Sequence, residues 1–410
     1  MKKRMCKIMA LAMTAAMVVP MAAQTTAFAA DDKEITYWNI AVESPDKDIV
    51  TAAVDKFNKE TESGYTVNSV AIQNDTYKEK LVIAMSSGEC PDMYSSWSGG
   101  PMYEYIDSGF AQPIDDLLDK SDVKDKLLDA AIEQGSYNGH VYAIPYLNVS
   151  LAGIFYNKDM FKQYGLEEPK TLADLENICA TLKENGITPF ALANGSKWTG
   201  SMYFMSLAAR YGGLEPFQNA VAGTGKFTDD CFIKAGEKIQ EWVKNGYFPD
   251  GVNSLSEDDG QAKQLLYQET AGMMLGGSFY TGAFQTDSEE FYQKKIGWFP
   301  IPAIDDSDAD PTIQIGTVGD QFISFNCEGD KLAAAFECAT DHLSDEVEDM
   351  IYSTGKIAPV KDAGDHISDP VVKEILMQPR KHLLSSCGMT SICQHLLHLH
   401  ILMAYRKYLV

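Results

Sequence analysis

The fold is decided by ITYWNI (residues 35–40), YTVNSVAI (65–72) and PDMYSSW (91–97), three apolar-rich runs near the start of the chain. Each run has the length of a buried strand and is bounded by turn-forming residues. The two segments between them carry apolar residues at helical intervals. The order strand, helix, strand, helix, strand predicts a parallel sheet covered by helices, which is the α/β class.

Both connecting helices have recognisable starts. Ser44 is expected to cap the first helix, with Pro45 at its first helical position, and Asn74 or Asp75 to cap the second. The residues expected to face the core are Ile49, Val50, Ala53, Val54 and Phe57 in the first helix, and Leu81, Ala84 and Met85 in the second.

A second α/β stretch follows a tight turn. Asn138 and Gly139 supply the positive φ angles of a two-residue hairpin, and Pro145 is expected to end the apolar run after it. A capping box at Thr171 and Asp174 opens a helix. Residues 197–245 read as mainly helical, and the remaining elements are expected at 151–157, 271–277, 296–302 and 321–326 (strands) and 332–343 (helix).

The two stretches meet near Pro145 without a long linker, so we expect two lobes that face one another across a cleft. The predicted parts are a signal peptide at 1–30, a first lobe at 31–144 plus 321–343, a second lobe at 145–320 plus 344–377, and an anomalous tail at 378–410.

The charge of the chain limits its partners. There are 34 Lys and Arg against 58 Asp and Glu, which gives a net charge of −24. A surface this acidic repels phosphate backbones and anionic lipids. Nucleic acid is therefore not expected as a partner, whereas a neutral ligand is compatible with the charge.

The N-terminus has the pattern of an export signal. MKKRMCK is followed by an apolar stretch and by small residues at Ala27 and Ala29, where cleavage is expected after Ala29 or Ala30. Cys6 precedes the apolar stretch, so we do not expect a lipoprotein-type anchor at the cleavage site. An exported protein, periplasmic or at the cell surface, is predicted. The later cysteines are interpreted mostly as small buried hydrophobic residues, with one disulfide left open.

Searches for catalytic and metal motifs fail. Gly223–Lys226 lacks the first glycine and the closing Ser or Thr of a phosphate loop. Asp306, Asp308 and Asp310 imitate a calcium loop, but Pro311 stands where Gly is needed. We predict no cofactor and no metal, and no enzyme, although paired carboxylates for glycoside cleavage remain open.

The tail differs in composition from the rest of the chain. No Asp or Glu follows Glu374, and four of the seven histidines lie between residues 382 and 400. His395, His398 and His400 with Cys387 and Cys393 imitate a metal site, but the abrupt change favours a different origin, such as an altered reading frame. We expect this segment to be poorly ordered and to be removed by proteases before either lobe is cut.

Aromatic and short polar residues gather at strand ends and loop starts. Trp97 follows one strand, Trp198 opens the helical region, Phe279 follows an apolar strand and Asp320 precedes another. Sugar rings present apolar faces and hydroxyl groups, so a site for them needs flat aromatic side chains with polar groups at the rim. This pattern predicts a carbohydrate site at the carboxyl ends of strands.

The chain resembles the extracellular sugar-binding proteins of ABC transporters, in particular oligosaccharide binders of the raffinose and multiple-sugar type. The resemblance covers about residues 33–375. The segments that carry it are CPDMYSSWSGG, YNGHVYAIPY, FYNKDMFKQYGLEEPKTLADL, ITPFALANGSKWTGSMYF, GMMLGGSFYTG, IGWFPIPA and GTVGDQFISFN, in that order. It implies the two-lobe type II periplasmic-binding-protein fold with the ligand cleft between the lobes.

The resemblance also implies the site residues. The positions expected to contact ligand are Trp97, Trp198, Phe279, Asp320, Asp75, Asn148 and Glu43. Trp97 and Trp198 would stack on sugar rings; Phe279 stands where many members carry Trp. The alternative for Asp75, Asn148 and Asp320 is a role as cap or turn former, and Trp38, Trp242 and Trp298 are expected in the core.

The implied function is capture of an oligosaccharide and its delivery to the permease of an ABC import system, by a protein expected to be monomeric. Two alternatives stay open: a secreted glycoside hydrolase, and a binder of another small solute. The chain departs from the family in lacking a lipid-anchor cysteine and in its histidine-rich tail.

Overall fold

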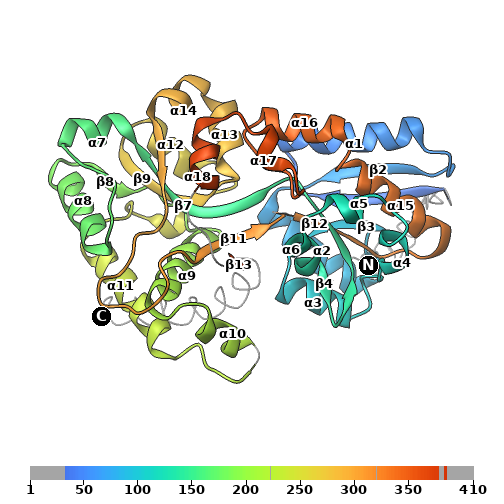
Figure 1. The fold of residues 1–410 in the computed structure, drawn as a ribbon, viewed down its shortest axis with the longest axis horizontal. Helices are drawn as coiled ribbons and strands as arrows, with labels where there is room; N and C mark the ends of the chain where they lie inside the picture. The colour runs from blue at the N-terminus through green and yellow to red at the C-terminus, as the bar shows by residue number, and fades with distance from the viewer. Residues whose placement is uncertain (1–32, 222, 320, 378–382, 386–410) are drawn as a thin grey trace, which may run out of the picture. The chain divides into compact units, whose positions relative to one another are not determined.

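The structure is a computed structural model that describes residues 33–221, 223–319, 321–377 and 383–385. The predicted signal peptide and most of the predicted tail lie outside these residues. The described chain forms two large sheets, each with its own helices, and a separate two-stranded hairpin (Figure 1).

The first sheet has five strands in the order β2-β1-β3-β12-β6. Their bounds are Glu34–Asn39 (β1), Thr66–Ala71 (β2), Met93–Ser96 (β3), Ala143–Tyr146 (β6) and Gln321–Phe325 (β12). β1 and β3 are parallel, as the sequence predicts, whereas β12 is antiparallel to both of its neighbours, β3 and β6. The chain therefore returns to this sheet after building the second one.

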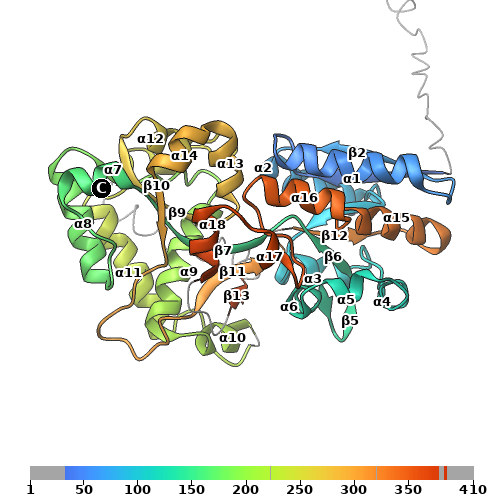
Figure 2. The same ribbon diagram turned by 45° about the horizontal axis from the view of Figure 1, so that its top comes forward.

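Helices α1 (Asp46–Glu60), α15 (Gly329–Asp341) and α16 (Asp345–Ser353) pack together beside the first sheet (Figures 1 and 2). The residues predicted to face the core in α1, and in α2 (Asn74–Ser87), are buried. Val347 and Ile351 of α16 join the first core. Because both residues lie in this core and α16 contacts α1, α16 belongs with the first sheet, which differs from the boundary predicted at Leu343.

Four local predictions in this part are wrong. α1 begins at Asp46, so Pro45 is its N-cap and not its first helical residue, and Ser44 lies too early to cap it. No side chain caps α2, whose first turn already contains Asn74 and Asp75. Pro145 does not end the run but lies inside β6, opposite Phe322. Proline is tolerated there because β6 is an edge strand, where a missing N–H costs no ladder bond.

The second sheet has the order β13-β11-β7-β9-β8, with β10 also pairing with β7. Its strands are Val149–Asn157 (β7), Thr188–Phe190 (β8), Ala271–Gly277 (β9), Ile296–Phe299 (β10), Gln314–Val318 (β11) and Leu383–Ser385 (β13). All nine residues of β7 are buried. β13 comes from the predicted tail and pairs in parallel with β11. This pairing differs from the expectation that the tail is poorly ordered.

The helices of the second part follow the predicted pattern. The capping box at Thr171 and Asp174 opens α8 (Leu172–Glu184), and residues 197–245 form α9 (Trp198–Gly212), α10 (Glu215–Val221) and α11 (Asp230–Lys244). The others are α7 (Lys158–Tyr164), α12 (Gln261–Tyr267), α13 (Tyr280–Asp287), α14 (Glu289–Lys295) and α18 (Pro370–Met377). The short 3-10 helix η1 (Val252–Ser254) precedes α12.

The remaining elements are short. The predicted hairpin is confirmed, because Tyr137 of β4 (Ser136–Tyr137) pairs with His140 of β5 (His140–Val141) across the Asn-Gly turn. The small helices are α3 (Gly100–Asp107), α4 (Asp115–Leu118), α5 (Val123–Lys126), α6 (Asp129–Gln134) and α17 (Ala363–His366).

Two further observations concern the described residues as a whole. None of their helices is both long enough and apolar enough to span a bilayer. The five described cysteines are free thiols, and Cys179, Cys231, Cys327 and Cys338 are buried, which agrees with their interpretation as hydrophobic residues.

Candidate ligand-binding site

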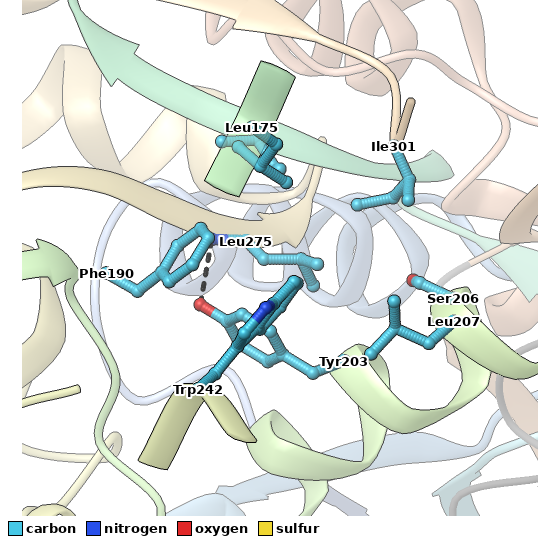
Figure 3. Close-up of a pocket in the computed structure, with 9 residues that line it drawn as sticks. Leu175, Phe190, Tyr203, Ser206, Leu207, Trp242, Leu275 and Ile301 are labelled. Carbon is cyan, nitrogen blue, oxygen red and sulfur yellow. Dashed lines mark hydrogen bonds between the residues drawn. The ribbon is translucent and has the colours of Figure 1, made fainter. Parts of the chain in front are cut away.

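A small cavity in the core of the second part is too narrow for a ligand. It holds about 10 Å³ and is lined by packed side chains of α8, α9, α11 and the sheet (Figure 3). The amide of Leu275 donates to the hydroxyl of Tyr203 at 3.4 Å. This volume is at the lower limit for one water molecule, so the cavity is a packing defect rather than a site.

Two of the predicted aromatic residues lie side by side. Trp198 is the first residue of α9, and Phe279 stands between β9 and α13. Their ring centroids are 6.0 Å apart with the planes inclined by 58°. Both side chains are only half-buried, whereas Trp242 and Trp298 are 2% and 1% exposed and lie in the core, as predicted.

The loop before Trp198 is held by a second loop. The carboxamide of Asn194 donates to Asn253 Oδ1 at 2.7 Å, and the amide of Gly195 donates to the carbonyl of Leu255 at 2.8 Å. A Cβ atom at Gly195 would lie 2.7 Å from that carbonyl oxygen, so only glycine allows this approach. The start of α9, and with it Trp198, is thereby fixed against residues 252–255.

Three buried polar atoms in these loops have no hydrogen-bond partner among the described residues. They are Ser196 Oγ, Trp198 Nε1 and Glu257 Oε2. Buried polar groups are nearly always paired in folded proteins, because an unpaired group costs about 1–3 kcal/mol. A donor, a hydroxyl and an acceptor beside an aromatic pair match the requirements of a polar ligand with apolar faces.

Glu257 was not predicted from the sequence, yet its segment is joined to the loop of Trp198 by the bond between Gly195 and Leu255. Its side chain is nine-tenths buried, and Tyr280 donates to its Oε1 at 2.7 Å. The ring of Tyr280 is in turn 4.5 Å from that of Phe279. Burial raises the pKa of Glu257 to about 7, while the bond from Tyr280 and the charge of Lys263 act in the opposite direction.

Asp75 links the first-sheet elements to these loops. It lies in the first turn of α2, and its backbone amide donates to Asp258 Oδ2 at 3.0 Å. Burial raises the pKa of Asp258, and the bond from the Asp75 amide lowers it. The hydrogen bond brings the start of α2 next to Glu257.

Trp97 lies beside the same helix. It follows β3, is half-buried, and meets Tyr77 of α2 edge-on at 5.9 Å. The ammonium group of Lys78 is 5.1 Å from the centroid of the Trp97 ring. Trp97 thus contacts α2, the helix that contains Asp75. From Asp75, contacts lead through the segment of Asp258 and Glu257 and through Tyr280 to Phe279 and Trp198.

Of the other predicted positions, the structure describes Asn148 and Glu43. Asn148 is fully buried, and its Oδ1 accepts from the amide of Ile357 at 2.8 Å, which favours a structural role at a chain crossing. Glu43 is exposed in the loop before α1. Asp320 lies outside the described residues. Among the residues that the structure does describe, no cluster of His, Cys, Asp and Glu could hold a metal ion.

Comparison with known proteins gives consistent matches. Residues 41–339 match the family model described as bacterial extracellular solute-binding protein. An ABC transporter extracellular-binding protein of Pyrococcus horikoshii is 31% identical over 229 residues, which are 55% of this chain and 50% of that protein. The matched segment thus spans about half the length of this curated relative.

Two solved structures show the same fold. One comes from work on xylan utilisation by Caldanaerobius polysaccharolyticus; it has a TM-score of 0.78 and 28% identity and covers 87% of this chain and 91% of its own. Another, a solute-binding protein in complex with raffinose, has a TM-score of 0.64 and 20% identity over 87% of this chain and 90% of its own. The two-lobe α/β fold predicted from the sequence is thereby confirmed.

Proposed function

Because the chain belongs to the family of bacterial extracellular solute-binding proteins, we propose that it captures an oligosaccharide between its lobes and delivers it to the permease of an ABC import system. The family consists of binding proteins. Proteins similar to this chain include a raffinose-bound solute-binding protein and a multiple sugar-binding protein. In this role the ligand is an oligosaccharide, the membrane partner is an ABC permease, and the protein acts as a monomer.

The observation that carries the proposal is the Trp198–Phe279 pair with its unpartnered polar neighbours. Aromatic faces cover the C–H faces of sugar rings, and hydroxyl groups need both donors and acceptors at the rim. Trp198 supplies a ring face and an unpartnered Nε1 donor in one side chain. The hydrogen bond between Asp75 and Asp258 supports a site at the meeting of the two lobes.

One experiment distinguishes a sugar-binding protein from a glycoside hydrolase. The protein is incubated with raffinose, with oligosaccharides from xylan and with control peptides and amino acids. We expect one class of sugar to raise the melting temperature, since a ligand that binds only the folded state stabilises it by mass action. The recovered sugars should be intact; shortened products would support a glycoside hydrolase, and stabilisation by peptides alone would contradict the proposal.

Replacing Trp198 with Ala is expected to weaken sugar binding by about 1–3 kcal/mol, because one large stacking face is lost. Isothermal titration with the sugar that stabilises the wild type best measures the change. Trp242→Phe is the matched control: this tryptophan is buried and its Nε1 donates to Glu176 at 2.9 Å. Its replacement should reduce stability and leave affinity unchanged. Unchanged affinity in Trp198→Ala with reduced stability would make Trp198 a core residue.

Binding is also expected to bring the lobes together. In the proposed mechanism, ligand between the lobes favours the arrangement in which Asp258 accepts a hydrogen bond from the Asp75 amide. A few residues at the ends of helices and strands would act as hinges. The radius of gyration from solution scattering should therefore fall when ligand is saturating. Identical scattering curves with and without ligand would argue against closure.

A further inference from the structure

The segment that carries Glu257 is held from both sides. The carbonyl of Leu255 accepts from Gly195, and three residues further on Asp258 accepts from the Asp75 amide. Within the segment, the Ser256 amide donates to Gln261 Oε1 at 2.6 Å, and the Asp259 amide donates to Ser256 Oγ at 3.2 Å. Glu257 therefore lies on a fixed backbone between the loop of Trp198 and the start of α2.

Only one of the two carboxyl oxygens of Glu257 has a hydrogen-bond partner among the described residues. Oε1 accepts from the Tyr280 hydroxyl, whereas Oε2 is buried with no hydrogen-bond partner among the described residues. A purely structural carboxyl group in this position would be expected to engage both oxygens, because the unpaired one is costly. Trp198 Nε1 and Ser196 Oγ, in the loop tied to the same segment, share this property.

We infer that Glu257 is a ligand-contacting residue whose Oε2 accepts a hydrogen bond from a ligand hydroxyl group, so that binding selects the ionised carboxylate and releases a proton. This inference rests on the proposed function. Bonds to ionised acceptors are shorter and about twice as strong as neutral ones, which makes the carboxylate the better partner for a hydroxyl donor.

The surroundings of Glu257 place its titration in a measurable range. Burial raises its pKa to about 7. Two neighbours favour the ionised form of Glu257: Tyr280 from α13 donates a hydrogen bond to it, and Lys263 from α12 is positively charged. The negative charges of Asp258 and Asp75 oppose its ionisation. Lys263 is itself paired with Asp287 at 2.7 Å. Acidic groups outnumber bases here, so a ligand that carries carboxylates is disfavoured.

The test is isothermal titration of the full chain with the best-binding sugar among raffinose and oligosaccharides from xylan. With a pKa of about 7 in the free protein, affinity at pH 8 should be about ten-fold tighter than at pH 6. At pH 7, titration in two buffers of different ionisation enthalpy should show release of about half a proton. This second measurement needs no variant.

Glu257→Gln keeps the shape of the side chain and an acceptor for Tyr280 but cannot ionise. We expect weaker binding at pH 8, no pH dependence between pH 6 and 8, and no proton release. Asp258→Asn should still release protons, although fewer at pH 7, because the loss of its charge lowers the pKa of Glu257. Glu290→Gln, on the exposed face of α14, should behave as wild type.

The outcomes separate the two proposals. If none of the sugars binds the wild type, the proposed function fails. If sugar binds with pH-independent affinity and no proton release, or if Asp258→Asn rather than Glu257→Gln abolishes the release, the function stands and the role of Glu257 is overturned.

Discussion

Replacing Arg210 with Met is expected to lower the free energy of unfolding by about 2–6 kcal/mol. Arg210 lies in α9 and is 4% exposed. Its guanidinium donates to the carbonyl of Ile301 through Nε (3.0 Å) and Nη2 (2.9 Å), and to that of Ile313 through Nη1 (2.7 Å). Methionine fills similar space but leaves both carbonyls without these donors, and each unpaired group costs about 1–3 kcal/mol.

Urea unfolding followed by tryptophan fluorescence measures this loss. Lys234→Met, on the exposed face of α11, is the matched control and should change stability by less than about 0.5 kcal/mol. Equal stability of the Arg210 variant and the wild type would show that water or other donors replace the guanidinium. Because Arg210 holds the same helix that begins with Trp198, partial unfolding here should also weaken sugar binding.

Raising the pH is expected to destabilise the ligand-free protein through Glu257 by about 3 kcal/mol. The pKa of this carboxyl rises from 4.5 to about 7 on folding, since burial disfavours its charge. Between these values the folded state holds more protons than the unfolded state, so stability falls as the pH increases from about 4.5 to 8. The difference between these two pKa values corresponds to about 3 kcal/mol, since one pKa unit is worth about 1.36 kcal/mol.

The measurement compares wild type and Glu257→Gln in urea at pH 5 and pH 8. Other groups titrate in both proteins, so the difference between the two pH slopes isolates Glu257. Between pH 5 and pH 8 the Gln variant should lose less free energy of unfolding than the wild type. Parallel slopes would mean that Glu257 titrates as in the unfolded chain.

Local chemistry explains what could be predicted from the sequence. The Asn-Gly hairpin and the capping box at Thr171 depend on neighbours within a few residues, and both are confirmed. Pro145 was misread because its tolerance depends on β6 lying at the edge of the sheet. That position is set by β12, far along the chain, and no local pattern reports it.

The same distinction holds for the site. The sequence singles out Trp198 and Phe279 as candidates because each follows or opens an element, and the structure places their rings together. Glu257 was not among the candidates, because nothing in SLSEDDGQ marks one of its acids as buried. Its environment arises from Tyr280 and from the loop of Gly195, which the fold brings together.

The position of β12 between β3 and β6 also governs when the first sheet can form. During synthesis, β1, β2, β3 and β6 emerge before the whole of the second sheet up to β11, and β12 emerges afterwards. Until then, β6 has no neighbour through which to join the other strands. Pairings this distant in sequence form slowly, because a large loop must close first. A nascent chain that stops before residue 321 should therefore expose the unpaired edges of β3 and β6, and completion of the sheet should wait for the last quarter of translation.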